Sequence, residues 1–275
     1  MKVAVILQGE PRFCKEFDHF THNLLGAEQV DYFAYLWQQS PNTSHLVGGQ
    51  GHIVTAPKWQ NVEIHWAVKK FQENLPPGHK LAKLTLASQE GLNFYQPTEN
   101  FAVETVIPNA WKMWYSQYQC NQLRLQFQQE AGIEYDLIIR TRPDVALMQP
   151  LDLLAIKQAI DQQPNLVVQP ANKCCGYGVH ISDLFGISSS HNMNIYFDIF
   201  NQAVDHHKRG VKFHPETMLA HHLTFNGLTY QSYNFSIEFR WFGKWRNNST
   251  GEEFASNVVP TWDGYSYMSD FGRWE

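Results

Sequence analysis

The sequence predicts an α/β protein with a mostly parallel central sheet flanked by helices. Two short apolar segments carry this prediction, residues 3–7 and residues 137–139. An unbroken apolar run of this length is typical of a strand covered on both faces, as in a parallel sheet. In addition, a long helical segment, 108–131, leads directly into the second run. Helices alternating with strands indicate α/β architecture.

Composition narrows the classes of protein that need to be considered. The chain has 275 residues, a net charge of −5 and no block of basic residues, which argues against nucleic-acid binding. No apolar run approaches the ~18 residues of a membrane span. The four cysteines lack metal-binding spacing, so we expect reduced thiols and a cytoplasmic protein. With no linker or repeat in view, we expect one domain over residues 1–275.

The first half of the chain begins with a strand, a sharp turn and a helix. Gly9-Glu10-Pro11-Arg12 follows the first strand, and a helix is expected over 13–25. This order opens many nucleotide-binding folds, although the dinucleotide motif G-x-G-x-x-G is not present. Arg12 is interpreted as a phosphate or base contact, or equally as a solvated turn residue. Residues 30–36 read as the second strand, 41–58 as a long loop and 62–66 as a weak strand.

The second apolar strand ends in a run of charged side chains. Arg140 and Arg142 are two residues apart, so in a strand they would share one face. Pro143 then stops the strand, which places Asp144 at or just past its carboxyl end. Ligands bind at that edge of open α/β sheets. Two cations beside one carboxylate suit a phosphorylated ligand, and the alternative is an Arg–Asp ion pair that holds a loop.

The second half of the chain predicts further helices and strands before an aromatic tail. Helices are expected over 151–160 and 190–204, strands over 165–168 and 179–183, and a last helix from Pro215 that ends at Gly227. The tail over 240–275 is rich in Trp, Tyr and Gly and shows no periodicity. It is interpreted as a cover for the sheet edge or as a wall that binds an acceptor sugar.

Two carboxylates in this half are candidates for catalysis. Asp183 follows an apolar strand and is either a catalytic or sugar-holding residue or a turn-forming one. Glu216 begins a helix, where the helix dipole alone favours an acidic residue. His214, His221 and His222 suggest zinc, but adjacent histidines face different ways and no H-E-x-x-H motif is present, so zinc is disfavoured.

Taken in order, these segments resemble a family of small bacterial and phage glycosyltransferase-like proteins with a GT-A-type fold. The resemblance spans about residues 3–227 and leaves out the aromatic tail. The segments that carry it are Ile6-Leu7-Gln8-Gly9-Glu10-Pro11-Arg12, Val30-Asp31-Tyr32-Phe33 with Trp37, Met113-Trp114-Tyr115-Ser116, Tyr135-Asp136 through Arg140-Thr141-Arg142-Pro143-Asp144, Ile181-Ser182-Asp183-Leu184-Phe185 and His214-Pro215-Glu216.

The resemblance implies a GT-A-like, Rossmann-related sheet that binds a nucleotide-sugar donor, with residues 1–150 as the nucleotide-binding half and 151–275 as the acceptor half. It implies that the nucleotide lies against Gln8, Gly9, Arg12, Arg140 and Arg142. Asp144 looks like the last acidic residue of the D-x-D metal motif, so Mn²⁺ or Mg²⁺ is expected. The position two before it is Arg142, which departs from that motif and weakens the metal site.

We therefore expect a glycosyltransferase that moves a sugar from a UDP- or GDP-sugar to a glycan or another hydroxyl acceptor. Asp183 and Glu216 are the candidates for the residue that removes the acceptor proton. A phage-encoded protein would act in the host cytoplasm. Two alternatives stay open. A sugar-1-phosphate nucleotidyltransferase would need a Gly-rich, Lys-bearing first loop, and Gly9-Glu10-Pro11-Arg12 is a poor version of one. A non-catalytic carbohydrate-binding protein would account for the aromatic tail.

Overall fold

A computed structural model of the chain describes residues 1–11, 17–38, 44–47, 52–55, 61–95, 97, 106–171, 175–176, 179–239, 244–247, 253–254, 258–261 and 264–267. Their central feature is a seven-stranded sheet in the order β14-β10-β13-β7-β1-β3-β6. Its strands are β1 (Lys2–Gly9), β3 (Gln29–Trp37), β6 (His79–Ala87), β7 (Leu137–Thr141), β10 (Leu166–Pro170), β13 (Gly186–Ser188) and β14 (Thr229–Tyr233).

The sheet is parallel except at one strand. β1 is parallel to both β3 and β7, β3 to β6, and β10 to β14, whereas β13 runs antiparallel to its neighbours β7 and β10. Strands from both halves of the chain therefore share one sheet. The prediction of a mostly parallel central sheet is confirmed.

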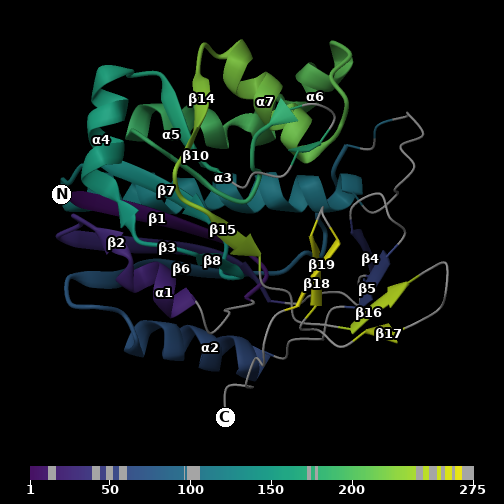
Figure 1. The fold of residues 1–275 in the computed structure, drawn as a ribbon, viewed down its shortest axis with the longest axis horizontal. Helices are drawn as coiled ribbons and strands as arrows, with labels where there is room; N and C mark the ends of the chain where they lie inside the picture. The colour runs from purple at the N-terminus through teal and green to yellow at the C-terminus, as the bar shows by residue number, and fades with distance from the viewer. Residues whose placement is uncertain are drawn as a thin grey trace.

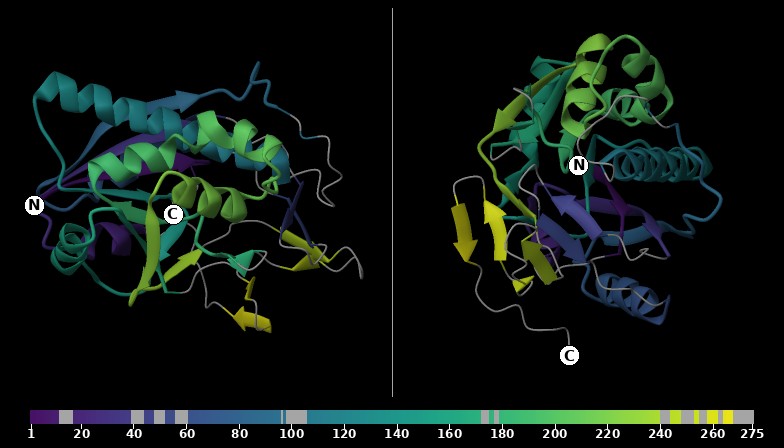
Figure 2. Two further views of the ribbon diagram at one scale, coloured as in Figure 1. Left: turned by 90° about the horizontal axis from the view of Figure 1, so that it is seen from above. Right: turned by 90° about the vertical axis from the view of Figure 1, so that its right-hand side faces the viewer.

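Helices cover both faces of the sheet. They are α1 (Phe17–His22), α2 (Asn61–Glu73), α3 (Val106–Ala131), α4 (Leu153–Gln162), α5 (Ser190–Phe197), α6 (Ile199–Lys208) and α7 (Pro215–Phe225). In Figures 1 and 2, α3 and α2 lie on opposite sides of the strands. The helices that flank the sheet are thus confirmed as well.

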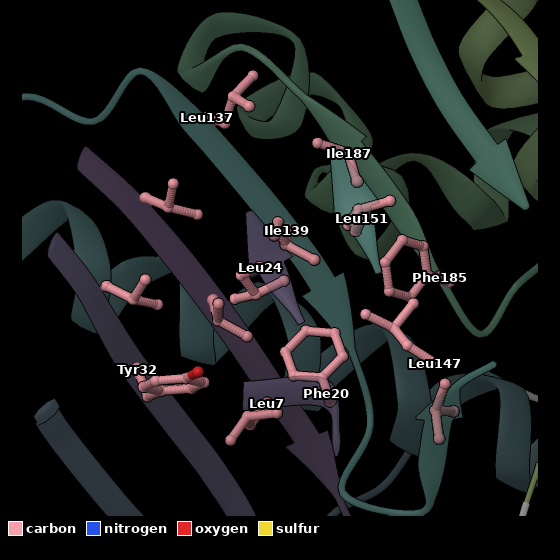
Figure 3. Close-up of a cluster of buried hydrophobic side chains, with 14 of the residues drawn as sticks. Leu7, Phe20, Leu24, Tyr32, Leu137, Ile139, Leu147, Leu151, Phe185 and Ile187 are labelled. Carbon is pink, nitrogen blue, oxygen red and sulfur yellow. The ribbon is translucent and has the colours of Figure 1, made fainter. Parts of the chain in front are cut away.

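The two faces of the sheet form two hydrophobic clusters, because alternate residues of a strand point to opposite faces. On one face, Val3, Val5 and Leu7 of β1 pack with side chains of α1, α2 and α4. Figure 3 shows Leu7, Phe20 and Phe185 among the side chains that converge there. On the other face, Ala4 and Ile6 pack with α3, α5, α6 and α7. Burial on both faces accounts for the unbroken apolar run of β1.

α3 is the longest helix and is held to α5 by a buried arginine. Arg124 has no exposed surface, and its guanidinium group donates hydrogen bonds to Asn121, Gln128, Ser190 and Asn194. Burial lowers the pKa of Arg124 to about 10. All four partners of this buried cation are neutral, and they satisfy its hydrogen-bond donors at the interface of α3 and α5.

Shorter strands surround the central sheet. β2 (Leu24–Leu25) pairs with β9 (Leu151–Asp152), β8 (Val145–Leu147) with β15 (Ile237–Phe239), β11 (Cys175–Gly176) with β12 (Val179–His180), and β18 (Val258–Thr261) with β19 (Gly264–Tyr267). A four-stranded sheet joins β4 (Ser44–Val47), β5 (His52–Thr55), β16 (Lys244–Asn247) and β17 (Glu253–Phe254). In Figure 1 this sheet lies beyond the carboxyl ends of the central strands.

Several predicted elements in the first half are corrected by these bounds. The helix expected over 13–25 is described only as α1, and the loop expected over 41–58 contains β4 and β5. The strand expected over 62–66 is part of α2. Ile64, Val68 and Phe71 of that helix are buried, a spacing that marks one helical face and that a five-residue window could not show.

Elements of the second half also differ from the expectation. The helix expected over 190–204 is two helices, α5 and α6, that meet at Asp198. The carboxylate of Asp198 accepts hydrogen bonds from Asn201 and Gln202 of α6. The strand expected over 179–183 is described as the two-residue β12, and the aromatic tail, for which no elements were predicted, contains β16 to β19. Asp263 and Asp270 of the tail lie outside the described residues.

Candidate active site

The candidate site lies at the carboxyl ends of β1 and β7. Successive strands β1, β3 and β6 advance toward one edge of the sheet, whereas β7 lies on the other side of β1. This reversal of strand order is a topological switch point, and ligands of open α/β sheets bind outside the strand ends at such a point. The polar residues that follow β1 and β7 are therefore placed at the same crevice.

β1 contributes Gln8 and Gly9. The Gln8 side chain is only 1% exposed, and its Oε1 accepts a 2.9 Å hydrogen bond from the hydroxyl of Ser116 on α3. Gly9 has a φ of 106°, and a Cβ atom at this position would meet open space. The backbone conformation, and not the packing, is thus what favours glycine at this turn.

β7 leads into an ion pair between Arg142 and Asp144. Nε and Nη2 of Arg142 donate to the two carboxylate oxygens of Asp144, at 2.9 and 2.8 Å. The arginine side chain is 19% exposed, whereas the aspartate is 1% exposed. Solvent therefore reaches the arginine side chain of the pair and not the aspartate. Burial acts to lower the pKa of Arg142, but Asp144, Asp183 and Glu10 outweigh it and raise the pKa.

Arg140 lies deeper, on the face of the sheet that α3 and α5 cover. Its side chain has no exposed surface, and its guanidinium nitrogens make no hydrogen bond with any residue that the structure describes. β-sheet register places Arg140 beside Gly186. A side chain at Gly186 would lie 3.3 Å from both the Gln169 amide nitrogen and the Tyr196 ring. Because Gly186 has none, Arg140, Gln169 and Tyr196 surround this position.

Asp183 is held in a turn near these cations. The backbone N–H of Ser182 donates to Oε1 of Gln169 at 3.0 Å, and the N–H of Leu184 donates to the Ser182 hydroxyl at 3.1 Å. Both bonds flank Asp183 in the sequence and fix its backbone. The Asp183 side chain is half-buried. Its position is consistent with both interpretations of the sequence, a turn residue and a functional carboxylate.

α7 brings His214 and Glu216 to the same site. His214 is the N-cap residue, and Pro215 occupies the first turn. Nδ1 of His214 lies 3.1 Å from Oε2 of Glu216. Burial lowers the pKa of the His214 imidazole, while the negative charge of Asp183 acts in the opposite direction. Asp183 is thus close enough to influence a side chain of α7.

Asp183 connects the separate parts of the site electrostatically. Burial lowers the pKa of Arg140, Arg142 lowers it further, and Tyr196, Asp183 and Asp144 oppose these effects. The charge of Asp183 acts on Arg140, Arg142 and His214 alike. The arrangement is a cluster of alternating cations and carboxylates at the switch point.

Asp144 is the one metal ligand that the sequence predicts, and Arg142 lies against it. Both of its carboxylate oxygens already accept hydrogen bonds from Arg142. Among the residues that the structure describes, no group of three or more His, Cys, Asp or Glu side chains could hold a metal ion. Mg²⁺ is often held by one or two carboxylates together with substrate phosphates, so the metal expected at Asp144 stays a prediction.

Comparisons with known proteins give likenesses in structure but none in sequence. No protein-family model matches this chain, and no curated protein sequence does. The fold is similar to the crystal structure of the glycosyltransferase GlyE from Streptococcus pneumoniae TIGR4, with a TM-score of 0.41 and 9% sequence identity. The alignment covers 84% of this chain and 44% of that one, so this chain spans less than half of its neighbour. A likeness of this strength does not bear on function.

Most of the predicted site residues meet in this cluster. Arg140, Arg142, Asp144 and Asp183 lie together, and Glu216 joins them through His214. Gln8 and Gly9 end the neighbouring strand. Arg12 lies outside the described residues. Their roles in binding and catalysis stay predictions.

Sequence reasoning missed three side chains of the site and underestimated a fourth. Gln169, Tyr196 and Lys112 were not considered, and His214 was considered only for zinc. The charge of Glu10 acts on Lys112, which extends the cluster to α3. Gln169 carried a weak signal, because it is polar within the otherwise apolar segment Leu166–Pro170. Tyr196 and Lys112 stand in helices with no distinguishing pattern.

Other predicted candidates have different surroundings. Trp37 is 2% exposed and stacks on Tyr115 with ring centroids 6.0 Å apart, which favours a packing role over a ligand contact. His222 accepts or donates a 3.1 Å hydrogen bond with His206 and bonds the Ile195 carbonyl. Cys120 is a buried free thiol.

None of the helices in the described part of the chain has the length and apolar composition that a membrane crossing requires.

Proposed function

We propose that this protein is a glycosyltransferase that binds a nucleotide-sugar donor at the carboxyl ends of β1 and β7. The observation that supports the proposal most is the cluster of Arg142, Asp144, Asp183 and Glu216 at the switch point of the sheet. Open α/β sheets bind nucleotides at this place. The family resemblance of the sequence, from Gln8 to Glu216, points to the same class of reaction.

The charges of the cluster suit the departure of a nucleoside diphosphate. In glycosyl transfer the bond from the anomeric carbon to the phosphate oxygen breaks, and negative charge develops on that oxygen. The Arg142 side chain is partly exposed, whereas Asp144 is buried, so we assign the contact with the diphosphate to Arg142. Arg140 is buried below and adds positive potential without an exposed surface.

The identities of the donor, the acceptor and the metal are part of this proposal. A UDP- or GDP-sugar and a hydroxyl acceptor are expected from the family resemblance. Mn²⁺ or Mg²⁺ is expected on the same ground, with Asp144 as its one candidate ligand. Since Arg142 occupies both oxygens of that carboxylate, we assign the offset of diphosphate charge to Arg142.

Thermal-shift measurements with UDP, GDP and CMP, each with and without MnCl₂, test the proposal. We expect UDP or GDP to raise the melting temperature of the protein. Arg142→Met should weaken that nucleotide by about 10- to 100-fold, the value of one charge-assisted hydrogen bond. Lys157→Met is the matched control, because Lys157 forms an ion pair with Asp161 on the exposed face of α4.

The same measurements separate the two alternatives. Stabilisation by a free glycan with no response to any nucleotide would favour a carbohydrate-binding protein. Stabilisation by a nucleoside triphosphate and a sugar phosphate, without a response to UDP or GDP, would favour a sugar-1-phosphate nucleotidyltransferase. Equal nucleotide affinity in the Arg142→Met and Lys157→Met variants would remove Arg142 from the site.

A further inference from the structure

Arg140 is a buried cation whose hydrogen-bond donors lack acceptors. Its side chain has no exposed surface, and its three guanidinium nitrogens make no hydrogen bond with any residue that the structure describes. Arg124 is equally buried, yet its guanidinium group donates to four neutral side chains. An arginine side chain stays charged in proteins, so an unpaired one in the interior is costly. Arg140 therefore needs an acceptor that the described side chains do not supply.

Gln169 and Tyr196 approach the same position from other elements. The register of β13 places Gly186 between Arg140 on β7 and Gln169 on β10. A Cβ atom at Gly186 would lie 3.3 Å from both the Gln169 amide nitrogen and the Tyr196 ring. Because the glycine has no side chain, the side chains of β7, β10 and α5 converge over its backbone.

The Gln169 amide and the Tyr196 hydroxyl both offer a donor there. Oε1 of Gln169 accepts the backbone N–H of Ser182 at 3.0 Å, which leaves Nε2, a group that only donates, at the other end of the amide. Neither this nitrogen nor the Tyr196 hydroxyl has a hydrogen-bond partner in the described structure, and both atoms are buried. Burial raises the pKa of Tyr196 to about 12, so the phenol keeps its proton.

Such a set of donors suits an anion better than a water molecule. Water accepts hydrogen bonds, but its own two protons also need acceptors. An anion only accepts, and it offsets the charge of a buried guanidinium group as well. Asp183 and Asp144 act on Arg140 electrostatically, but neither of them accepts a hydrogen bond from it. The donors of this position therefore favour an anion.

Burial limits the size of that anion. The side chains of Arg140 and Gln169 have no exposed surface, and that of Tyr196 is 1% exposed. Protein interiors are close-packed, so an anion enters only when these side chains move apart in a local opening. A monatomic anion requires the smallest movement. A phosphate or a carboxylate brings further atoms, for which more side chains would have to move.

We propose that Arg140, Gln169 and Tyr196 form a buried binding site for a monatomic inorganic anion, with chloride as the physiological ligand. The inference goes beyond the proposed function and does not depend on it, because it needs no nucleotide. A bound chloride offsets the charge of Arg140 at short range. The potential that Arg140 adds to the nucleotide site is then largest in the anion-free protein.

Thermal unfolding in sodium chloride, sodium bromide and sodium gluconate at equal ionic strength tests the site. Chloride and bromide should raise the melting temperature above its value in gluconate, which is too large to enter. We expect a rise of about 3 °C when the halide is at about ten times its dissociation constant. Equal melting temperatures in the three salts over the whole range of concentrations would overturn the proposal.

Two substitutions should abolish the difference between chloride and gluconate. Arg140→Met removes the cation, and Gln169→Glu supplies an internal acceptor while one oxygen still accepts the N–H of Ser182. Arg209→Met, at an exposed position that ends α6, is the control and should keep the difference. If Arg140→Met does not fold, Gln169→Glu decides. An unchanged response to chloride in either folded variant would overturn the proposal.

Diffraction from crystals soaked in sodium bromide measures the site directly, because bromide scatters anomalously. The expected result is an anomalous peak within hydrogen-bond distance of Arg140, Gln169 and Tyr196. No peak there, at a bromide concentration that raises the melting temperature, would place the salt effect elsewhere and end the proposal. A response to chloride but to no nucleotide would leave this inference intact while the proposed function fails, and the reverse result would overturn this inference alone.

Discussion

At the scale of single residues, the ion pair of the site differs from a surface ion pair in its burial. Asp144 is 1% exposed and pairs through both oxygens with Arg142, whereas the exposed pair of Lys157 and Asp161 is joined at 2.7 Å on the surface. Buried ion pairs are costly to break by removing one partner, because the remaining charge is left without compensation. Exposed pairs contribute little.

This difference predicts the effect of two matched substitutions. Asp144→Asn should lower the free energy of unfolding by about 2–3 kcal/mol, less than for a fully buried pair because Arg142 is partly exposed. Asp161→Asn, whose side chain is 59% exposed, should cost below about 1 kcal/mol. Urea unfolding of both variants checks this. Equal losses would show that the Arg142–Asp144 pair is not a stabilising contact.

At the scale of elements, the turn between α2 and β6 depends on one glycine. Gly78 has a φ of +84°, and a side chain there would lie 2.6 Å from the backbone oxygen of Glu28. That distance is shorter than any real contact, and backbone cannot move aside as a flexible side chain can. Gly91 has a similar φ of +77° but open space around it.

Alanine substitutions at these two glycines separate the cost of the backbone conformation from the cost of a steric clash. Gly91→Ala should lower the free energy of unfolding by about 1 kcal/mol, because alanine is strained in a left-handed backbone conformation. Gly78→Ala should cost about 2 kcal/mol more, because the strand β6 or the segment before β3 must shift. Thermal and urea unfolding of both variants measure the difference. Similar losses would show that the turn relaxes around the added methyl group.

At the scale of the whole molecule, buried neutral histidines make stability depend on pH. Burial lowers the pKa of His222 to about 4, although its bond to the Ile195 carbonyl and the charge of Asp198 act to raise it. His206 contacts it at 3.1 Å, and burial, His221 and Arg209 lower the pKa of His206 while Asp205 opposes them. Neither ring is readily protonated in the folded state.

The sign of the effect follows from the folded and unfolded pKa values. The unfolded state binds a proton near the ordinary pKa of histidine, about 6.5, and the folded state only near the lowered value. Stability is therefore full above about pH 7 and falls as the pH drops toward about 4, by on the order of 3 kcal/mol from His222.

Denaturant unfolding at several pH values tests this expectation. His222→Gln should be less stable than wild type at neutral pH, because the bond to Ile195 is altered, and should lose less stability on acidification. The exposed His191→Gln should follow the wild-type profile. An unchanged pH dependence in His222→Gln would assign the acid sensitivity to other groups, such as the carboxylates of the candidate site.

The local sequence was enough to predict the strands β1 and β7 and the charged residues that follow β7. The apolar runs of β1 and β7 indicate burial on both faces, which only the middle of a layered α/β structure provides. The order Arg140, Arg142, Pro143, Asp144 indicates that charges follow a buried strand. Both features are properties of neighbouring residues, so they are visible without the fold.

Tertiary packing determined the contacts and the burial that the local sequence could not predict. Arg140 and Arg142 were expected to share one face, yet Arg140 is sealed in the core and Arg142 reaches solvent, because β7 ends at Thr141. Gln169 lies beside Gly186 only through the register of β10 with β13. His214 is near Asp183 because α7 packs on the sheet. Contacts between distant segments depend on strand register and helix packing, which no local pattern of residues records.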